Sequence, residues 1–488
     1  MSSGSAENLK TSVAKGFLWG GMSNAFCQLL NLFFGIFLAR ILSPEDFGPI
    51  GMLAIFSAIA GSLQDSGFVA AIANRKEVSH DDYNAVFWFN VLISFAMYAA
   101  LFVAAPLIVD FFEEPSLLWL SRYIFLGFVV AGFGIAPSAY LFRNLKVKER
   151  SMAQILSIVV SGSVGILMAM NGYSFWGIAT QSILFVLVRS VVCWCYTPWR
   201  PSIRVSFAPL RYLFAFSYRL LITNIFLRIN WNIFSFILGG NNRLYSKVDV
   251  GNYTKAAEWM TMGAETVNGM VNGLAQPVLA KVADDDERQL RVFRKMLRFT
   301  AFVSFPLLLG LSLVAPQIIV IAITDKWIES AYMLRILAVW GAFMPIQSMF
   351  TNLMVSRGKS NIYMWSTMVQ GIIVLLLLVV VSPLGINGML ATYVMFNVLW
   401  LFVWRFFAGR EIALTLGMFL RDMMPFALLS VGVMFLTYWL TASFTDVYNQ
   451  FFLRVAVAAL LYVGVLLLCR SEELDEVVQF LFKGKRNL

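Results

Sequence analysis

Apolar runs long enough to cross a lipid bilayer recur along the whole chain, separated by short polar connections. A helix needs about 20 apolar residues to span the hydrocarbon core, and its backbone groups bond within the helix because lipid offers them no partner. We predict about 14 such helices. Their approximate bounds are 15–38, 47–73, 84–109, 117–141, 152–170, 174–196, 211–238, 254–280, 299–322, 330–355, 361–381, 386–407, 422–441 and 451–469.

The composition agrees with a membrane protein, since 59% of the residues are apolar and only 13% are charged. A soluble globular domain has roughly 25% charged residues. The net charge of +10 is scattered in short clusters, so no basic face for nucleic acid is predicted. The predicted fold class is therefore an all-α polytopic membrane protein. We expect two six-helix lobes, 1–200 and 201–410, followed by a helix pair and tail, 411–488.

The positive charges also predict the orientation of the chain. An even number of spans places both termini on one side, and the connections on that side carry clusters of Lys and Arg residues, whereas the opposite connections are short and poor in positive charge. Such connections are cytoplasmic by the positive-inside rule. The residues concerned are Arg143, Lys146, Lys148, Arg150, Arg200, Arg204, Arg211, Lys281, Arg288, Arg291, Arg294, Lys295, Arg298, Lys483, Lys485 and Arg486.

Two connections resemble one another at an offset of 203 residues. The segments 40–48 and 243–251 share Arg, Ser, Asp and Gly at equivalent places, and each joins the first two predicted spans of one half. Many transporters are built from two related bundles. The offset therefore supports two lobes related by an internal repeat.

Polar residues within the predicted spans indicate candidate binding sites, because ionisable groups are costly in lipid and face a cavity or a partner. On the span 254–280 they recur at spacings of three and four, which places them on one helical face. This face indicates either a hydrated cavity or hydrogen bonds between helices. The candidates are Glu258, Glu265, Asn268 and Asn272, together with Thr254 and Thr261.

Two other spans carry shorter polar patterns. Asn24, Gln28 and Asn31 share one face of the first span, and Asn224 and Arg228 share one side of the seventh. Arg189, on the sixth span, is equally compatible with a cavity and with an interfacial position. Glu258, Glu265 and Asp65 are candidates for coupling to protons or sodium ions. The sequence predicts no catalytic residue, metal site or cofactor.

Short motifs occur along most of the chain, at 39–48, 65–68, 87–90, 251–253, 276–279, 305–310 and 325–327. These motifs resemble those of the polysaccharide transport family, the Wzx-type flippases for lipid-linked oligosaccharides. This family is part of the multidrug/oligosaccharidyl-lipid/polysaccharide exporter superfamily. The resemblance implies a two-lobed exporter fold in the bacterial inner membrane. It also implies transport of an undecaprenyl-diphosphate-linked repeat unit for O-antigen, capsule or exopolysaccharide to the periplasmic leaflet.

A diphosphate with several sugars cannot cross about 30 Å of hydrocarbon unaided, so we expect alternating access through a polar cavity. The expected partners are the lipid-linked oligosaccharide, membrane lipids, a coupling H⁺ or Na⁺, and the polysaccharide polymerase machinery. Two alternatives stay open at this stage. A multidrug or small-solute exporter would favour an aromatic, apolar cavity. A membrane glycan polymerase or ligase would be expected to carry a sizeable extramembrane loop or an intramembrane catalytic cluster.

Overall fold

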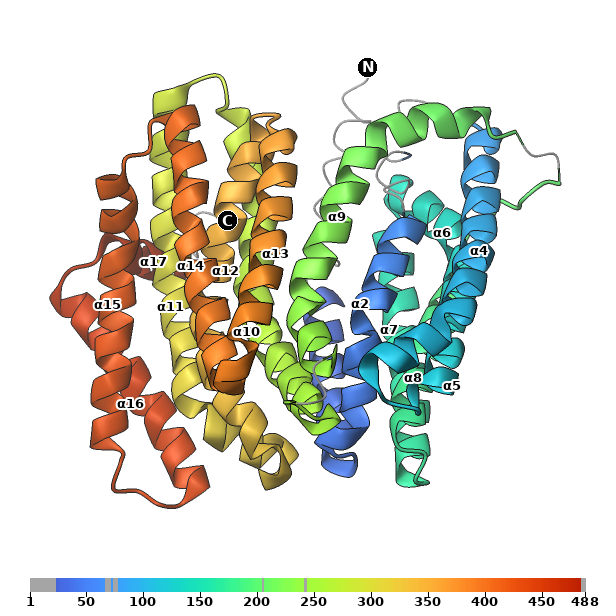
Figure 1. Ribbon diagram of the computed structural model, residues 1–488. Coiled ribbons are helices and arrows are strands. Elements are labelled where there is room, and N and C mark those ends of the chain that lie inside the picture. Colours follow the sequence, from blue (N-terminus) through green and yellow to red (C-terminus); the bar gives the residue numbers. More distant parts are fainter. Residues whose placement is uncertain (1–22, 66–71, 73–77, 204–205, 241–243, 484–488) are drawn as a thin grey trace. The chain divides into compact units, whose positions relative to one another are not determined.

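The structure is a computed structural model that describes residues 23–483 apart from 66–71, 73–77, 204–205 and 241–243 (Figure 1). Within these residues the chain is helical and has no strand, which confirms the predicted all-α class. The helices are Ser23–Ile41, α2 (Pro44–Asp65), α4 (His80–Phe112), α5 (Leu117–Ile124), α6 (Leu126–Arg143), α7 (Val147–Met170), α8 (Phe175–Tyr196), α9 (Ala208–Gly240), α10 (Lys247–Lys281), α11 (Asp286–Ile323), α12 (Ile328–Ser356), α13 (Ser360–Val381), α14 (Gly385–Ile412), α15 (Leu416–Leu440), α16 (Val447–Leu468) and α17 (Glu472–Lys483).

Twelve helical stretches among the described residues are long and apolar enough to cross a membrane, and the protein is therefore a multi-pass membrane protein. One of them, Ser360–Ile412, contains both α13 and α14, which a short 3₁₀ turn at Ser382–Leu384 joins. The helix α10 is not among the twelve, because its polar residues lower its mean hydropathy. By this measure the predicted number of 14 helices is not confirmed.

The chain packs as two compact units, Met1–Gly251 and Asn252–Leu488. In the first unit α8 packs against α6 and α7, and α9 packs against α2 and α4. In the second unit α11 is central and contacts α12, α15 and α16, while α14 packs against α12 and α13. The predicted domain bounds at residues 200 and 410 stay a prediction.

Several helices begin where a side chain caps the first turn. Ser79 and Asp82 form a reciprocal capping box at the start of α4. Asp285 accepts a hydrogen bond from the backbone N–H of Arg288 at 2.9 Å and caps α11. These polar caps fix the residues at which α4 and α11 begin.

The two repeated connections have the same local structure. The backbone N–H and hydroxyl of Ser43 both donate to Asp46 at 2.8 Å, and those of Ser246 donate to Asp249 at 2.8 and 3.0 Å. Each carboxylate thereby closes the turn that starts a helix. This local agreement supports the internal repeat.

The repeated segments also contact each other within the first unit. A Cβ atom at Gly48 would overlap the carbonyl oxygen of Lys247, and one at Gly251 would overlap that of Pro44. Pro44 and Lys247 are themselves 203 residues apart, so the two contacts are equivalent under the repeat. Lys247 also pairs with Glu45 at 3.0 Å, and this hydrogen bond raises the pKa of the Lys247 ammonium above its ordinary value. Glycine is needed at both crossings, because only a residue without Cβ lets the backbones come this close.

Candidate functional site

A polar cavity of about 350 Å³ lies among four helices of the first unit. Its walls come from the helix Ser23–Ile41 and from α6, α7 and α8. The residues that line it are Ser23, Asn24, Cys27, Gln28, Asn31, Ser138, Val147, Arg150, Ser151, Gln154, Arg189 and Cys193. Most of these carry a hydrogen-bonding group, which is unusual for a site inside a membrane bundle.

A second cavity of about 380 Å³ adjoins the first, since both are lined by Ser138, Arg150, Arg189 and Cys193. It extends toward α2, where Gly61 forms part of its wall. The two cavities together make a polar space that is large enough for a phosphorylated group with attached sugars. We refer to the two together as the N-unit cavity.

Packing of small residues positions the walls. The helix Ser23–Ile41 rests on α7 through a buried cluster of Cys27, Phe34 and Ile158. The ring of Phe34 lies where a Cβ atom at Gly162 would be, so the two helices approach closely. This contact turns the polar face of the first helix, with Asn24, into the N-unit cavity.

Two guanidinium groups make the N-unit cavity cationic. Arg150 extends from α7, is half-buried, and lies 4.6 Å from the centre of the Phe142 ring. Arg189 extends from α8 and is exposed toward the cavity. No Asp or Glu is among the described residues that line either part of this space. Its positive charge is therefore not neutralised by a lining carboxylate, and the cavity attracts anions.

The structure brings Asn24, Gln28 and Asn31 together on one wall, as their spacing predicts. It adds Arg150 and Gln154, which are not among the predicted site residues. The apolar pattern predicts Arg150 in a connection, whereas the structure places it in the first turn of α7. The i, i+4 spacing of Arg150 and Gln154 could have indicated a polar face, had the predicted span begun a few residues earlier.

The predicted polar stripe of α10 lies in the second unit and takes part in local contacts. Glu258 pairs with Lys255 at 2.7 Å, and the side chain of Lys255 is only 2% exposed. Lys255 also lies 6.0 Å from the centre of the Trp327 ring. Lys255 is not among the predicted site residues, although it lies one turn before Glu258 on the same helical face.

Further along the stripe, side-chain amides make the contacts. Asn268 donates to Glu265 at 3.2 Å, and Asn352 of α12 donates to Asn272 at 2.9 Å. Asn268 is buried, whereas Asn272 is exposed. Part of the stripe thus serves hydrogen bonding between helices, which was one of its two predicted readings.

The remaining candidates are not placed in the N-unit cavity. Asn224 and Arg228 are exposed on α9 in the first unit, and they line neither part of that space. A site that they share with the α10 stripe stays a prediction. Asp65 is the last residue of α2, and its side chain lies outside the described residues.

The chain is similar in sequence to proteins of bacterial polysaccharide biosynthesis. The chain is 26% identical over 362 residues to the lipopolysaccharide biosynthesis protein WzxC of Escherichia coli K12, covering 73% of this chain and 72% of that protein. It is 22% identical over 455 residues to the teichuronic acid biosynthesis protein TuaB of Bacillus subtilis 168, covering 92% and 93%.

The fold is that of the lipid II flippase MurJ in an inward closed conformation. The two structures superpose with a TM-score of 0.73 at 14% sequence identity, over 93% of this chain and 99% of that one. The family described as polysaccharide biosynthesis protein matches residues 37–332, which is more than half of the 488 residues. The chain therefore belongs to the polysaccharide biosynthesis protein family, in agreement with its resemblance to Wzx-type flippases.

Proposed function

We propose that this protein is a flippase that moves a polyprenyl-diphosphate-linked oligosaccharide from the cytoplasmic to the periplasmic leaflet of a bacterial inner membrane. Membership of the family, the names of the relatives and the fold of a lipid II flippase support this function. The observation that carries it is the cationic N-unit cavity. Both termini are cytoplasmic in this proposal, and the two lobes alternate access to the two sides.

The chemistry of the N-unit cavity fits such a substrate. Arg150 and Arg189 hold the diphosphate, because a guanidinium donates two parallel hydrogen bonds to phosphate oxygens. The amides of Asn24, Gln28 and Gln154 exchange hydrogen bonds with sugar hydroxyls. The polyprenyl chain stays in the bilayer, where it requires no polar partner. Two cations in a space that no described carboxylate lines lower the cost of taking a diphosphate out of water.

The multidrug or small-solute exporter is less well supported by the same residues. No aromatic residue is among the described residues that line the N-unit cavity, whereas a site for apolar drugs is lined mainly by hydrophobic and aromatic side chains. Transport needs no catalytic group, and we propose no covalent step. A glycan polymerase or ligase is distinguished from a flippase by whether the sugar becomes accessible from the periplasm in cells that lack the protein.

Ion coupling belongs to the same proposal. Glu258 and Glu265 are the described carboxylates of the α10 stripe, and Glu258 is 43% exposed and paired with Lys255. A proton or a sodium ion that binds Glu258 competes with the Lys255 ammonium. Binding of the ion and breaking of this pair would then be linked to movement of the helices.

The cellular test measures whether the sugar becomes accessible from the periplasm. A periplasmic enzyme modifies the lipid-linked oligosaccharide in cells that carry the wild type or the double variant Arg150→Gln, Arg189→Gln. We expect modification to fall about tenfold or more, since each lost charge-assisted bond is worth about 1.5 to 3 kcal/mol. The control is Lys148→Gln, because Lys148 is an exposed cation on the same helix outside the cavity.

Normal modification in the double variant would remove the N-unit cavity from the transport path. Normal modification in cells without the protein, together with missing polymer, would instead favour the polymerase or ligase.

A further inference from the structure

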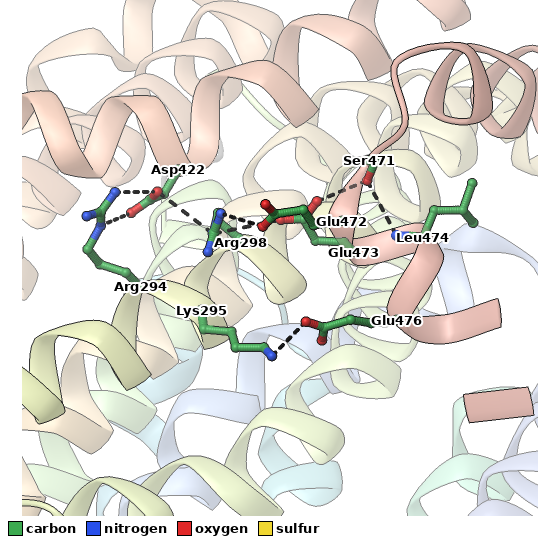
Figure 2. Close-up of polar contacts among 9 residues, drawn as sticks. All are labelled: Arg294, Lys295, Arg298, Asp422, Ser471, Glu472, Glu473, Leu474 and Glu476. Atoms are coloured by element: carbon green, nitrogen blue, oxygen red, sulfur yellow. Dashed lines mark hydrogen bonds and ion pairs between the residues drawn. The ribbon is translucent and has the colours of Figure 1, made fainter. Parts of the chain in front are cut away.

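A second cluster of charges links α11, α15 and α17 in the second unit (Figure 2). On α11 the basic residues Arg294, Lys295 and Arg298 lie within one turn, at spacings of one and three. On α17 three glutamates have the same spacing, and they are Glu472, Glu473 and Glu476. A basic turn of α11 therefore faces an acidic turn of α17.

The contacts across this surface are uneven. Lys295 pairs with Glu476 at 2.7 Å, but both side chains are more than half exposed. Arg298 lies 3.7 Å from Glu472 and 3.7 Å from Glu473, too far for hydrogen bonds. An exposed pair such as Lys295–Glu476 contributes little to stability. The Glu473 side chain is only 14% exposed, but its contact with Arg298 does not reach hydrogen-bonding distance. The ion pairs of Arg298 with α17 are therefore loose.

Arg294 is engaged differently. Its guanidinium donates two hydrogen bonds to Asp422 of α15, at 2.6 and 3.0 Å, and the Asp422 side chain is 3% exposed. Arg298 is 4.0 Å from the same carboxylate, and its Nε is buried without a hydrogen-bond acceptor among the described residues. Arg298 thus has donor capacity that no described acceptor satisfies.

A cavity of about 310 Å³ opens beside these cations, between α10, α11 and α17. Lys295 and Arg298 line it, as do the three glutamates of α17. Its other walls are almost entirely apolar and include Val267, Met270, Val271, Met296, Phe299 and Val303. An apolar cavity with two cations at its edge matches an amphiphile that has an anionic head.

We propose that this cavity binds an anionic phospholipid of the bilayer, with part of an acyl chain inside and the headgroup phosphate between Lys295 and Arg298. The glutamates of α17 occupy the phosphate position when the lipid is absent, so α17 and the lipid compete. The basic turn lies at the end of α11 that the positive-inside pattern predicts to be cytoplasmic, where anionic headgroups attract Lys and Arg.

The lining selects a phospholipid over a sugar-bearing lipid. Thr300 is the one hydroxyl or amide side chain among the described lining residues, so away from its charged edge the cavity offers sugar hydroxyls few hydrogen-bonding partners. The N-unit cavity, by contrast, offers several amides and hydroxyls. This site is therefore independent of the proposed transport function.

The test measures how much phosphatidylglycerol the purified full-length protein retains in detergent, by native mass spectrometry, with phosphatidylcholine as the zwitterionic reference. For Lys295→Gln with Arg298→Gln we expect retention of phosphatidylglycerol to fall about 25-fold, at about fivefold for each cation near the surface. For Glu472→Gln, Glu473→Gln and Glu476→Gln together we expect retention to rise. The matched control is Arg291→Gln, an exposed cation of α11 that does not line the cavity.

The glutamate variant keeps the test decisive if the cation variant folds poorly. A purely structural role of the charge pairs predicts that loss of the glutamates lowers retention, which would overturn the proposal. Equal retention of phosphatidylglycerol in the cation variant and in Arg291→Gln would also overturn it. So would displacement of bound phosphatidylglycerol by a lipid-linked oligosaccharide at a much lower concentration than by phosphatidylglycerol of a different mass, which would assign the site to the substrate.

Discussion

At the scale of residues, the second unit buries one ammonium beside a partly exposed carboxylate. The Lys255 side chain is 2% exposed, while Glu258 is 43% exposed and lies 2.7 Å away. A buried charge is stabilised by a nearby opposite charge. The pair therefore stabilises the buried Lys255 ammonium more than the Glu258 carboxylate, because water reaches the carboxylate.

The replacement Glu258→Gln should therefore destabilise the protein by about 1.5 to 3 kcal/mol, the range for a hydrogen bond to a charged group. The measurement is thermal unfolding of the purified variant in detergent. The double variant Lys255→Met, Glu258→Gln should recover most of the loss, since it removes the buried ammonium together with the carboxylate. Wild-type stability of Glu258→Gln would show that the pair has no structural role.

The residues of the candidate site were only partly predictable from the sequence. The spacing of Asn24, Gln28 and Asn31 predicts that they share one helical face, and in the structure all three line the N-unit cavity. Arg150 was not predicted there, because a cation near the end of an apolar run is more simply explained by the positive-inside rule. Whether such a cation faces water or a cavity depends on the neighbouring helices, which the spacing does not specify.

At the scale of elements, the crossing of α2 and the start of α10 depends on two glycines. The repeat of 203 residues predicts that Gly48 and Gly251 are equivalent. The repeat does not predict that Gly48 lies against the backbone of Lys247, or Gly251 against that of Pro44, because equivalent residues need not be in contact. That reciprocal contact, with Lys247 and Pro44, is a finding of the structure.

Gly48→Ala and Gly251→Ala should each destabilise the protein by about 1 to 3 kcal/mol, as overpacking of a close contact does. The added methyl group would meet a carbonyl oxygen, and backbone cannot move aside as a flexible side chain can. Thermal unfolding in detergent gives the comparison. The control is Gly269→Ala on the same α10, where nothing lies within 4 Å of the new Cβ; an equal effect at Gly269 would contradict the role of the crossing.

At the scale of the whole molecule, apolar run length alone was enough to predict a helical membrane protein, because lipid leaves the backbone few alternatives. The number of spans was harder to fix, since α10 is interrupted by polar residues and α13 and α14 follow each other closely. The amphipathic α17 lies in the segment predicted as a tail, and its 12 residues are too few to span a bilayer.

The charge of the proposed substrate predicts a dependence on the membrane potential. A headgroup with about two negative charges that moves outward gains about 2.3 kcal/mol per charge for each 100 mV, if nothing compensates the charge. Collapse of the potential in intact cells should therefore slow export, as measured by periplasmic modification of the sugar. Unchanged export after loss of the potential and of both ion gradients would exclude coupling of either kind.

We propose above all that the protein moves a lipid-linked oligosaccharide across the bilayer with its headgroup bound in the N-unit cavity. The most direct measurement reconstitutes the purified protein in vesicles and follows the transfer of a labelled polyprenyl-diphosphate oligosaccharide between leaflets. We predict rapid transfer with the wild type and with Lys148→Gln, and slow transfer with Arg150→Gln, Arg189→Gln. Equal transfer by the double variant and the wild type, or none by any of them, would contradict the account.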